Sequence, residues 1–219
     1  MSTRPPRNPT HRPRWVRPAF FASAACLWLG ALAAMFYFLT AYTYRHTPMG
    51  TPPSAHAARI PLASDRLTLV MAVHPHCPCT RASIFELERL LVRCPGRIDC
   101  RILVFLPEAA PLDWAGPDPF GLASRLTDIH RINDFGGALA RSLGCTTSGA
   151  VVLYDTHGEP VFWGGITAAR GHAGDNLGSD SITAIAHGRA HVRRVTPVYG
   201  CALTRDVATA STCCREHTP

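Results

Sequence analysis

The sequence contains no lysine, and all 22 of its basic residues are arginine. No chemistry requires this choice, which is typical of a GC-rich coding bias. Acidic residues are absent from the first 17 positions, which hold five arginines, whereas the other 202 residues carry 17 arginines and 15 acidic residues. The formal net charge of +7 is therefore concentrated at one end of the chain and not on a folded face. This distribution argues against nucleic acid as a partner.

Charged residues are scarce as well, at 17% of the chain, while hydrophobic residues make up 47%. That balance excludes a disordered or collagen-like chain and allows a hydrophobic core. The sequence has no internal repeat, and its 219 residues suffice for one ordinary domain with an additional segment.

The additional segment is an uncharged run from Pro18 to Tyr44. A helix needs about 20 apolar residues to cross a bilayer, so this run predicts a transmembrane helix over residues 18–44. The preceding arginines place the basic N-terminus, residues 1–17, in the cytoplasm by the positive-inside rule. A signal peptide cleaved near Ala31-Leu32-Ala33 is an alternative, but the apolar run exceeds the ~7–15 residues of a signal h-region. An uncleaved signal-anchor therefore fits best, and a lipoprotein modified at Cys26 fits less well because the preceding residues lack the usual leucine.

The segment after the anchor is rich in proline, threonine and alanine, and residues 45–64 are expected to form a semi-extended linker. Residues 65–201 would then be a periplasmic domain on a single-pass protein of the bacterial inner membrane. Residues 202–219 form a polar tail that contains two of the nine cysteines. Disulfides persist in an oxidising compartment, so the cysteines are candidates for redox chemistry or for structural bridges.

Changes of hydrophobic period predict an α/β domain. Residues 67–73 are typical of a buried strand, and residues 100–106 form a second apolar run. Between them a helix from Arg81 to the Pro95-Gly96 pair places Ile84, Leu87, Leu90 and Leu91 on one face, with Glu86, Glu88 and Arg89 off that face. Strand–helix–strand is the βαβ unit of α/β domains. The later predicted elements are two helical pieces over 122–144, a hairpin of 151–154 with 161–163, and a helix over about 180–191.

The motif His74-Pro75-His76-Cys77-Pro78-Cys79 stands between the first strand and the first helix. A helix N-terminus carries unpaired N–H groups and a partial positive charge, which stabilise a thiolate, and Arg81 adds a full charge nearby. A disulfide between cysteines separated by one residue is tight, and strain makes a disulfide easier to reduce. The motif therefore predicts a relatively oxidising redox pair.

The same motif supports a second chemistry, metal binding, because two imidazoles and two thiolates lie within six residues: His74, His76, Cys77 and Cys79. Soft thiolates favour Cu(I), and thiolate with imidazole also suits Zn(II). Redox exchange requires no cofactor, whereas this alternative implies copper. An inert structural bridge between Cys77 and Cys79 is a third interpretation, although it would close almost no loop and add little stability.

The order of elements and the position of these cysteines resemble the thioredoxin superfamily across about residues 65–192. With the N-terminal anchor, the strand at 148–155 and the segment at 164–172, they resemble bacterial membrane proteins of the RedB type. The resemblance implies a thioredoxin-like central sheet with flanking helices, preceded by one transmembrane helix. It implies Cys77 as the attacking cysteine and Cys79 as the resolving thiol. The sequence departs from the superfamily at Thr80, where the resolving cysteine usually stands, and at 146–149, which lacks the usual proline.

The function that follows from this resemblance is that of a membrane-tethered thiol–disulfide exchange protein, a possible oxidoreductase acting on protein thiols or disulfides in the periplasm. A copper-delivery protein of the same fold, with His172 as a further ligand by analogy, and a non-catalytic binding module are the alternatives. Cys94 and Cys100 bracket the turn 95–99 and are interpreted as a structural disulfide. Cys145 and Cys201 have no partner that the sequence assigns.

Overall fold

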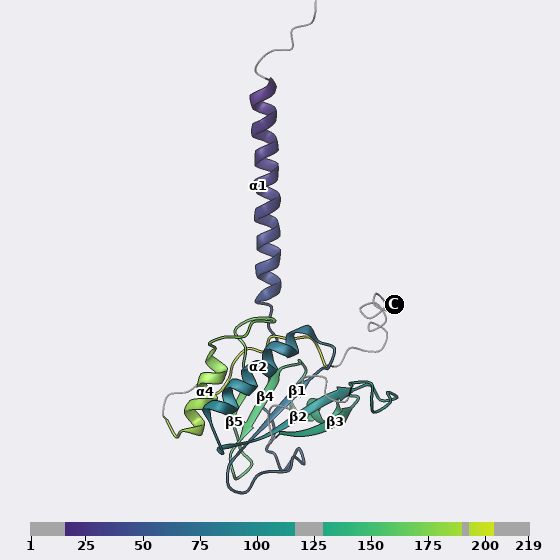
Figure 1. The fold of residues 1–219 in the computed structure, drawn as a ribbon, viewed down its shortest axis with the longest axis vertical. Coiled ribbons are helices and arrows are strands. Elements are labelled where there is room, and N and C mark those ends of the chain that lie inside the picture. The colour runs from purple at the N-terminus through teal and green to yellow at the C-terminus, as the bar shows by residue number, and fades with distance from the viewer. Residues whose placement is uncertain (1–15, 117–128, 190–192, 204–219) are drawn as a thin grey trace, which may run out of the picture. The chain divides into compact units, whose positions relative to one another are not determined.

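The computed structural model describes residues 16–116, 129–189 and 193–203, which belong to two units, 1–43 and 44–219. The described part of the first unit is helix α1, Val16–Thr43 (Figure 1). Residues Phe20–Thr43 of this helix are long and apolar enough to cross a membrane. The apolar N-terminal helix expected from the sequence is therefore present.

The second unit is built on one mixed sheet of five strands in the order β3-β2-β1-β4-β5. These are β1 (Leu67–Val73), β2 (Ile98–Leu106), β3 (Ile129–Phe135), β4 (Ala150–Tyr154) and β5 (Pro160–Gly165). Strands β1, β2 and β3 are parallel, and the β4–β5 hairpin joins β1 in the antiparallel sense. A βαβ unit with an antiparallel hairpin beside its first strand is a thioredoxin-like sheet, which confirms the predicted fold class.

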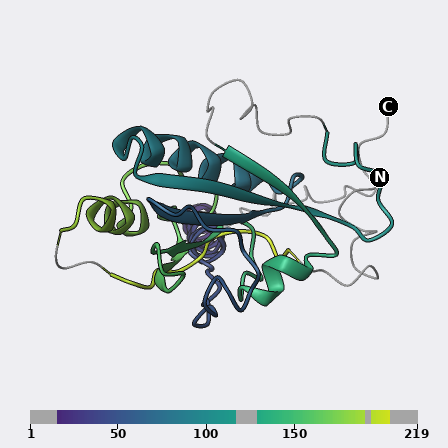
Figure 2. The ribbon, with the colours of Figure 1, turned by 90° about the horizontal axis from the view of Figure 1, so that it is seen from below.

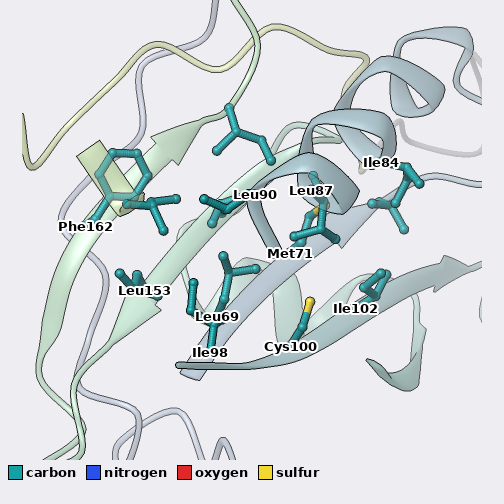
Figure 3. Close-up of a cluster of buried hydrophobic side chains, with 14 of the residues drawn as sticks. Leu69, Met71, Ile84, Leu87, Leu90, Ile98, Cys100, Ile102, Leu153 and Phe162 are labelled. Atoms are coloured by element: carbon teal, nitrogen blue, oxygen red, sulfur yellow. The ribbon is translucent and has the colours of Figure 1, made fainter. Parts of the chain in front are cut away.

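Helices cover both faces of this sheet (Figure 2). Helix α2 (Pro78–Arg93) and helix α4 (Leu177–Ala186) pack on one face, where α2 contributes Ile84, Leu87 and Leu90 to the core (Figure 3). The short helix α3 (Ala138–Ser142) packs on the other face. Residues alternate between the two faces along β1, since Leu69 and Met71 belong to the first core and Val70 and Ala72 to the second.

Two predicted helices differ from those observed. Residues 129–135 form β3 and are not helical, while 117–128 lie outside the described residues. The isoleucines at 129 and 132 have helical spacing, but pairing with the edge of β2 overrides this local pattern. Helix α4 begins earlier than expected, because the Asn176 side chain caps it by accepting from the Ser179 amide at 2.8 Å, and it ends at Ala186.

The stretch 45–64, expected to be an extended linker, instead packs against the domain. Met49, Ala55, Ala58 and Ile60 are buried in the second core. The Ala55 amide donates to the Gly158 carbonyl at 2.8 Å, and Thr47 pairs with Val198 through two backbone bonds of 2.9 and 3.2 Å. Small and apolar residues between the prolines supply this buried surface, so composition alone gave the wrong structure for the segment.

The predicted disulfide between Cys94 and Cys100 is not formed, and both residues are buried free thiols. The turn between them closes early, with the Arg97 amide donating to the Cys94 carbonyl at 3.2 Å. Cys94 remains at the end of α2 while Cys100 enters β2 opposite Leu69 of β1. Burial raises the pKa of both thiols, which makes them unreactive core residues.

Candidate functional site

The predicted site residue Cys77 lies at the turn from β1 into α2, where it is the N-cap of the helix. Pro78 occupies the first helical position, which suits its fixed φ and its lack of an N–H group. The Cys77 amide donates to the His74 carbonyl at 3.1 Å, and the Cys77 carbonyl accepts from the Thr80 amide at 3.0 Å. Because α2 begins at Pro78 and not at Arg81, Cys79 lies within its first turn.

A third cysteine, Cys201, lies beside this pair although it is more than 120 residues away in the sequence. The sulfur atoms of Cys77, Cys79 and Cys201 all lie within 4.8 Å of one another. Cys77 and Cys79 are buried, and Cys201 is partly exposed. The structure therefore brings together both predicted cysteines and one residue that the sequence left without a partner.

Backbone pairing positions Cys201. Its carbonyl accepts from the Ser148 amide at 2.8 Å, and the Leu203 amide donates to the Thr146 carbonyl at 2.9 Å. An isolated bridge between Thr147 and Ala202 extends this pairing. Cys201 lies beside α2 because its segment pairs with residues 146–148, which are distant in the sequence. The one local signal was its place after Gly200, which is too common an arrangement to identify a site.

The three thiols differ in their protonation. The pKa of Cys77 is lowered to about 5, first because the Cys201 thiol donates a hydrogen bond to the Cys77 sulfur. Burial acts in the opposite direction and raises this pKa, while the Cys201 amide and the Thr80 hydroxyl lower it further. The pKa of Cys79 is raised, first by burial and then by the negative charge on Cys77. The pKa of Cys201 is raised, first because its thiol donates to Cys77 and then by burial. At neutral pH the site thus holds one thiolate and two thiols.

Thr80 and Ser148 lie where the sequence departs from the thioredoxin pattern, at position 80 and within the stretch 146–149. The Ser148 hydroxyl lies 2.7 Å from the Thr80 hydroxyl and accepts from the His74 amide at 2.9 Å. The single proton of the Thr80 hydroxyl is shared between the Cys77 sulfur and the His74 carbonyl, which lies 3.1 Å away. These bonds join the loop before β4 to the turn that carries Cys77, so the same loop positions both Cys77 and Cys201.

The positive charge that acts on Cys79 and Cys201 comes from Arg170. Both terminal nitrogens of this arginine donate to the Gly200 carbonyl, the Nη1 atom at 2.6 Å. Arg81, which the sequence suggested for this role, is exposed on α2. The guanidinium of Arg170 therefore holds the backbone next to Cys201 and favours a negative charge on the neighbouring sulfurs.

A buried carboxylate, Glu86 of α2, fixes the loop that follows Arg170. Glu86 is fully buried, although its place off the apolar helix face predicted exposure. It accepts from the Gly174 amide at 2.7 Å, from the Asn176 side chain at 3.2 Å and from Arg89 at 3.0 Å. A buried carboxylate is tolerated when several donors bond it, and here two of the three donors come from the loop between β5 and α4.

The two histidines of the motif contact aromatic rings. The His74 ring stacks on Phe105 with centroids 5.2 Å apart, and the His76 ring lies 4.4 Å from Trp114. The pKa of His74 is lowered, first by burial and then by its neighbour His76, so its ring is neutral. His172 is exposed, with its Nδ1 atom 2.8 Å from the Arg170 carbonyl.

The arrangement therefore offers a metal ion sulfur ligands and not imidazole ligands. Within the described part of the chain, the compact group of potential ligands consists of Cys77, Cys79 and Cys201. Three soft thiolates suit Cu(I). The metal set expected from the sequence, His74 and His76 with Cys77 and Cys79, is not the one that this geometry brings together.

No protein-family profile matches the sequence, and no curated protein is similar to it at a significant level. Among solved structures, an uncharacterised conserved protein from Geobacillus kaustophilus is similar with a TM-score of 0.55 and 18% identity, over 75% of this chain and 93% of the other. A hypothetical protein from Sinorhizobium meliloti is similar with a TM-score of 0.54 and 15% identity, over 75% and 95% of the two chains.

A more distant similarity is to a secreted disulfide oxidoreductase of Mycobacterium tuberculosis, with a TM-score of 0.39 and 13% identity over 57% of this chain and 83% of the other. At such identities the similarities concern the fold and not the activity. The similarities with TM-scores of 0.55 and 0.54 agree with the fold derived above from strand order.

Proposed function

We propose that this protein is a membrane-tethered, extracytoplasmic thiol–disulfide exchange protein in which Cys77 is the nucleophile. The observation that carries the proposal is the position of Cys77 at the N-terminus of α2, where donors from Cys201 and Thr80 lower its pKa to about 5. A thiol attacks only as its thiolate, so at neutral pH Cys77 is in the reactive form.

The chemistry begins with attack of the Cys77 thiolate on one sulfur of a partner's disulfide. A bond forms between Cys77 and that sulfur, and the partner's other sulfur leaves as a thiolate that takes a proton from water. A neighbouring thiol of the cluster can then release the partner. Because the fold stabilises the Cys77 thiolate, it stabilises the reduced protein, and the disulfide form is a relatively strong oxidant.

The proposed location rests on α1 and on the charges before it. Five arginines precede the apolar segment, which favours a cytoplasmic N-terminus and a periplasmic thioredoxin-like domain. Protein thiols or disulfides would be the partners there. A reporter that is active only in the periplasm, fused after Pro219, should be active, whereas activity of a cytoplasmic reporter at the same position would contradict this topology.

The nucleophile can be tested apart from the resolving step. We would place the full-length Cys79→Ser/Cys201→Ser variant in detergent, reduce it, expose it to glutathione disulfide, alkylate it and digest it with trypsin. Cleavage after Arg66 and Arg81 gives peptide 67–81, which should carry glutathione on Cys77. The same variant with Cys77→Ser should carry none on this peptide. Absence of the adduct from the first variant would refute the proposed function.

Copper handling is the second candidate, favoured by the three sulfurs within 4.8 Å. It requires that the reduced full-length protein take up one Cu(I) tightly against a chelator, and that loss of any one of the three cysteines weaken the binding. Such uptake, together with no glutathione adduct on Cys77, would replace the redox proposal. A non-catalytic binding module would show neither behaviour, and its Cys77 would titrate near the ordinary thiol value of 9.0.

A further inference from the structure

We infer that Cys201, and not the neighbouring Cys79, is the resolving thiol of this site, and that the oxidised protein carries a Cys77–Cys201 disulfide. This inference rests on the proposed exchange function and adds a residue to it. The sequence motif and the resemblance had both pointed to Cys79, which follows Cys77 by two positions.

Helix geometry disfavours a bridge between Cys77 and Cys79. The Cys79 sulfur also lies within 4.8 Å of the Cys77 sulfur, and its thiol hydrogen-bonds to that sulfur. However, Cys77 caps α2 and Cys79 lies in its first turn, and a disulfide across a single intervening residue is tight. The Cys77 carbonyl is also held by the Thr80 amide at 3.0 Å. A bond between these two sulfurs would therefore require the first turn of the helix to rearrange.

Cys201 approaches Cys77 from a separate segment and has no such constraint. Its sulfur lies within 4.8 Å of the Cys77 sulfur, and its thiol donates a hydrogen bond to it. The segment is fixed on both sides, by the Arg170 bond to the Gly200 carbonyl and by the Leu203 bond to the Thr146 carbonyl. We expect rotation of the two side chains to bring the sulfurs to bonding distance without opening a turn of α2.

The resolving step balances as follows. Once Cys77 carries a partner's sulfur in a mixed disulfide, Cys201 loses its proton to solvent and its thiolate attacks the Cys77 sulfur. The Cys77–Cys201 bond forms, the bond from Cys77 to the partner breaks, and the partner leaves as a thiolate that takes up a proton. The partner disulfide has then gained two electrons and the protein has lost two. An external dithiol must supply two electrons to restore the reduced site.

Trypsin distinguishes the two bridges in the full-length protein. Cys77 and Cys79 share peptide 67–81, and Cys201 lies in peptide 195–205. A Cys77–Cys79 bridge leaves peptide 67–81 as one internally linked species, whereas a bridge to Cys201 joins the two peptides.

We would oxidise the reduced protein in detergent with glutathione disulfide, alkylate it and digest it without reductant. The variants are Cys77→Ser, Cys79→Ser and Cys201→Ser, with Cys26→Ser as a control in α1, and circular dichroism reports their folding.

We expect the joined peptides in the unmodified protein, in Cys79→Ser and in Cys26→Ser, and their absence from Cys77→Ser. In Cys201→Ser the glutathione adduct on Cys77 should last at least about tenfold longer than in Cys79→Ser, because the thiol that displaces glutathione is gone. Internally linked peptide 67–81 with a free Cys201, and a long-lived adduct in Cys79→Ser but not in Cys201→Ser, would overturn the inference. That pattern would leave the proposed function intact, because the adduct in the Cys79→Ser/Cys201→Ser variant tests it separately.

Discussion

Gly200 lies so close to Ser148 that a Cβ atom added at Gly200 would overlap the Ser148 carbonyl oxygen. The Ser148 amide donates to the carbonyl of Cys201, the residue after Gly200. The Ser148 hydroxyl accepts from the His74 amide in the turn that carries Cys77. Cys201 can therefore lie at the N-terminus of α2 only because residue 200 is a glycine. This close backbone contact allows the hydrogen bonds that join the two parts of the site.

Gly200→Ala should consequently uncouple Cys201 from Cys77. The segment 200–203 has to move away from Ser148, and Cys77 then loses the hydrogen bond that contributes most to its low pKa. We expect the pKa of Cys77, measured from the pH dependence of its alkylation, to rise from about 5 towards the ordinary 9.0. Gly50→Ala is a matched control, since a Cβ there meets nothing within 4 Å and should leave the titration unchanged.

The reactivity of Cys77 should depend on pH in a way that separates it from the other thiols in the described part of the domain. With its pKa lowered to about 5, its alkylation rate should be constant at neutral pH and fall as the pH drops through about 5. The folded pKa lies below the ordinary 9.0, so the stability that this thiolate contributes is present at alkaline pH and is lost as the pH falls through about 5. A rate that instead falls below about pH 9 would contradict the proposed environment.

The N-terminal stretch of the second unit should be required for stability. A fragment that begins at Tyr44 retains the buried side chains of Met49, Ala55 and Ala58, whereas one that begins at Arg59 loses them. Loss of this packing should lower the free energy of unfolding by about 3 kcal/mol or more, as measured by urea denaturation. The shorter fragment also loses the pairing of Thr47 with Val198, next to the segment that carries Cys201. Equal stability of the two fragments would show that residues 45–58 are a linker after all.

Glu86→Ala should destabilise the domain by about 3 kcal/mol, because the Gly174 amide and the Asn176 side chain would lose their buried acceptor. The released loop follows directly on Arg170, so the hydrogen bond from Arg170 to the Gly200 carbonyl should weaken as well. Thermal unfolding measures the first effect, and the rate at which a dithiol reduces the oxidised site measures the second. Glu159→Ala removes an exposed carboxylate at the β4–β5 turn and should change neither.

Much of the fold was predictable because it depends on patterns between near neighbours. The apolar runs at β1 and β2 and the helical spacing of Ile84, Leu87 and Leu90 predict the βαβ unit without reference to any distant residue. The Asp155–Gly158 turn likewise predicts the β4–β5 hairpin, because these residue types adopt turn conformations locally. The uncharged run that became α1 is the clearest signal of this kind.

Two of the three cysteines of the candidate site were predictable for the same reason. Cys77 and Cys79 stand between a strand pattern and a helix pattern, so their place at a helix N-terminus follows from the sequence. What the sequence could not supply was the burial of Glu86, the strand at 129–135 or the packing of 45–64, each of which depends on a partner far along the chain.

Cys201 is the strongest example of what only the tertiary structure decided. Nothing within several residues of it indicates a thiol site. It is held beside Cys77 by the bond from the Ser148 amide to its own carbonyl and by bonds of its neighbours, Leu203 to the Thr146 carbonyl and Arg170 to the Gly200 carbonyl. Hydrogen-bond pairing between distant segments depends on the path of the whole chain. It produces no hydrophobic periodicity in either segment from which it could be predicted. The sequence by itself determined that two cysteines would stand at a helix N-terminus, and the tertiary structure determined which third thiol stands beside them.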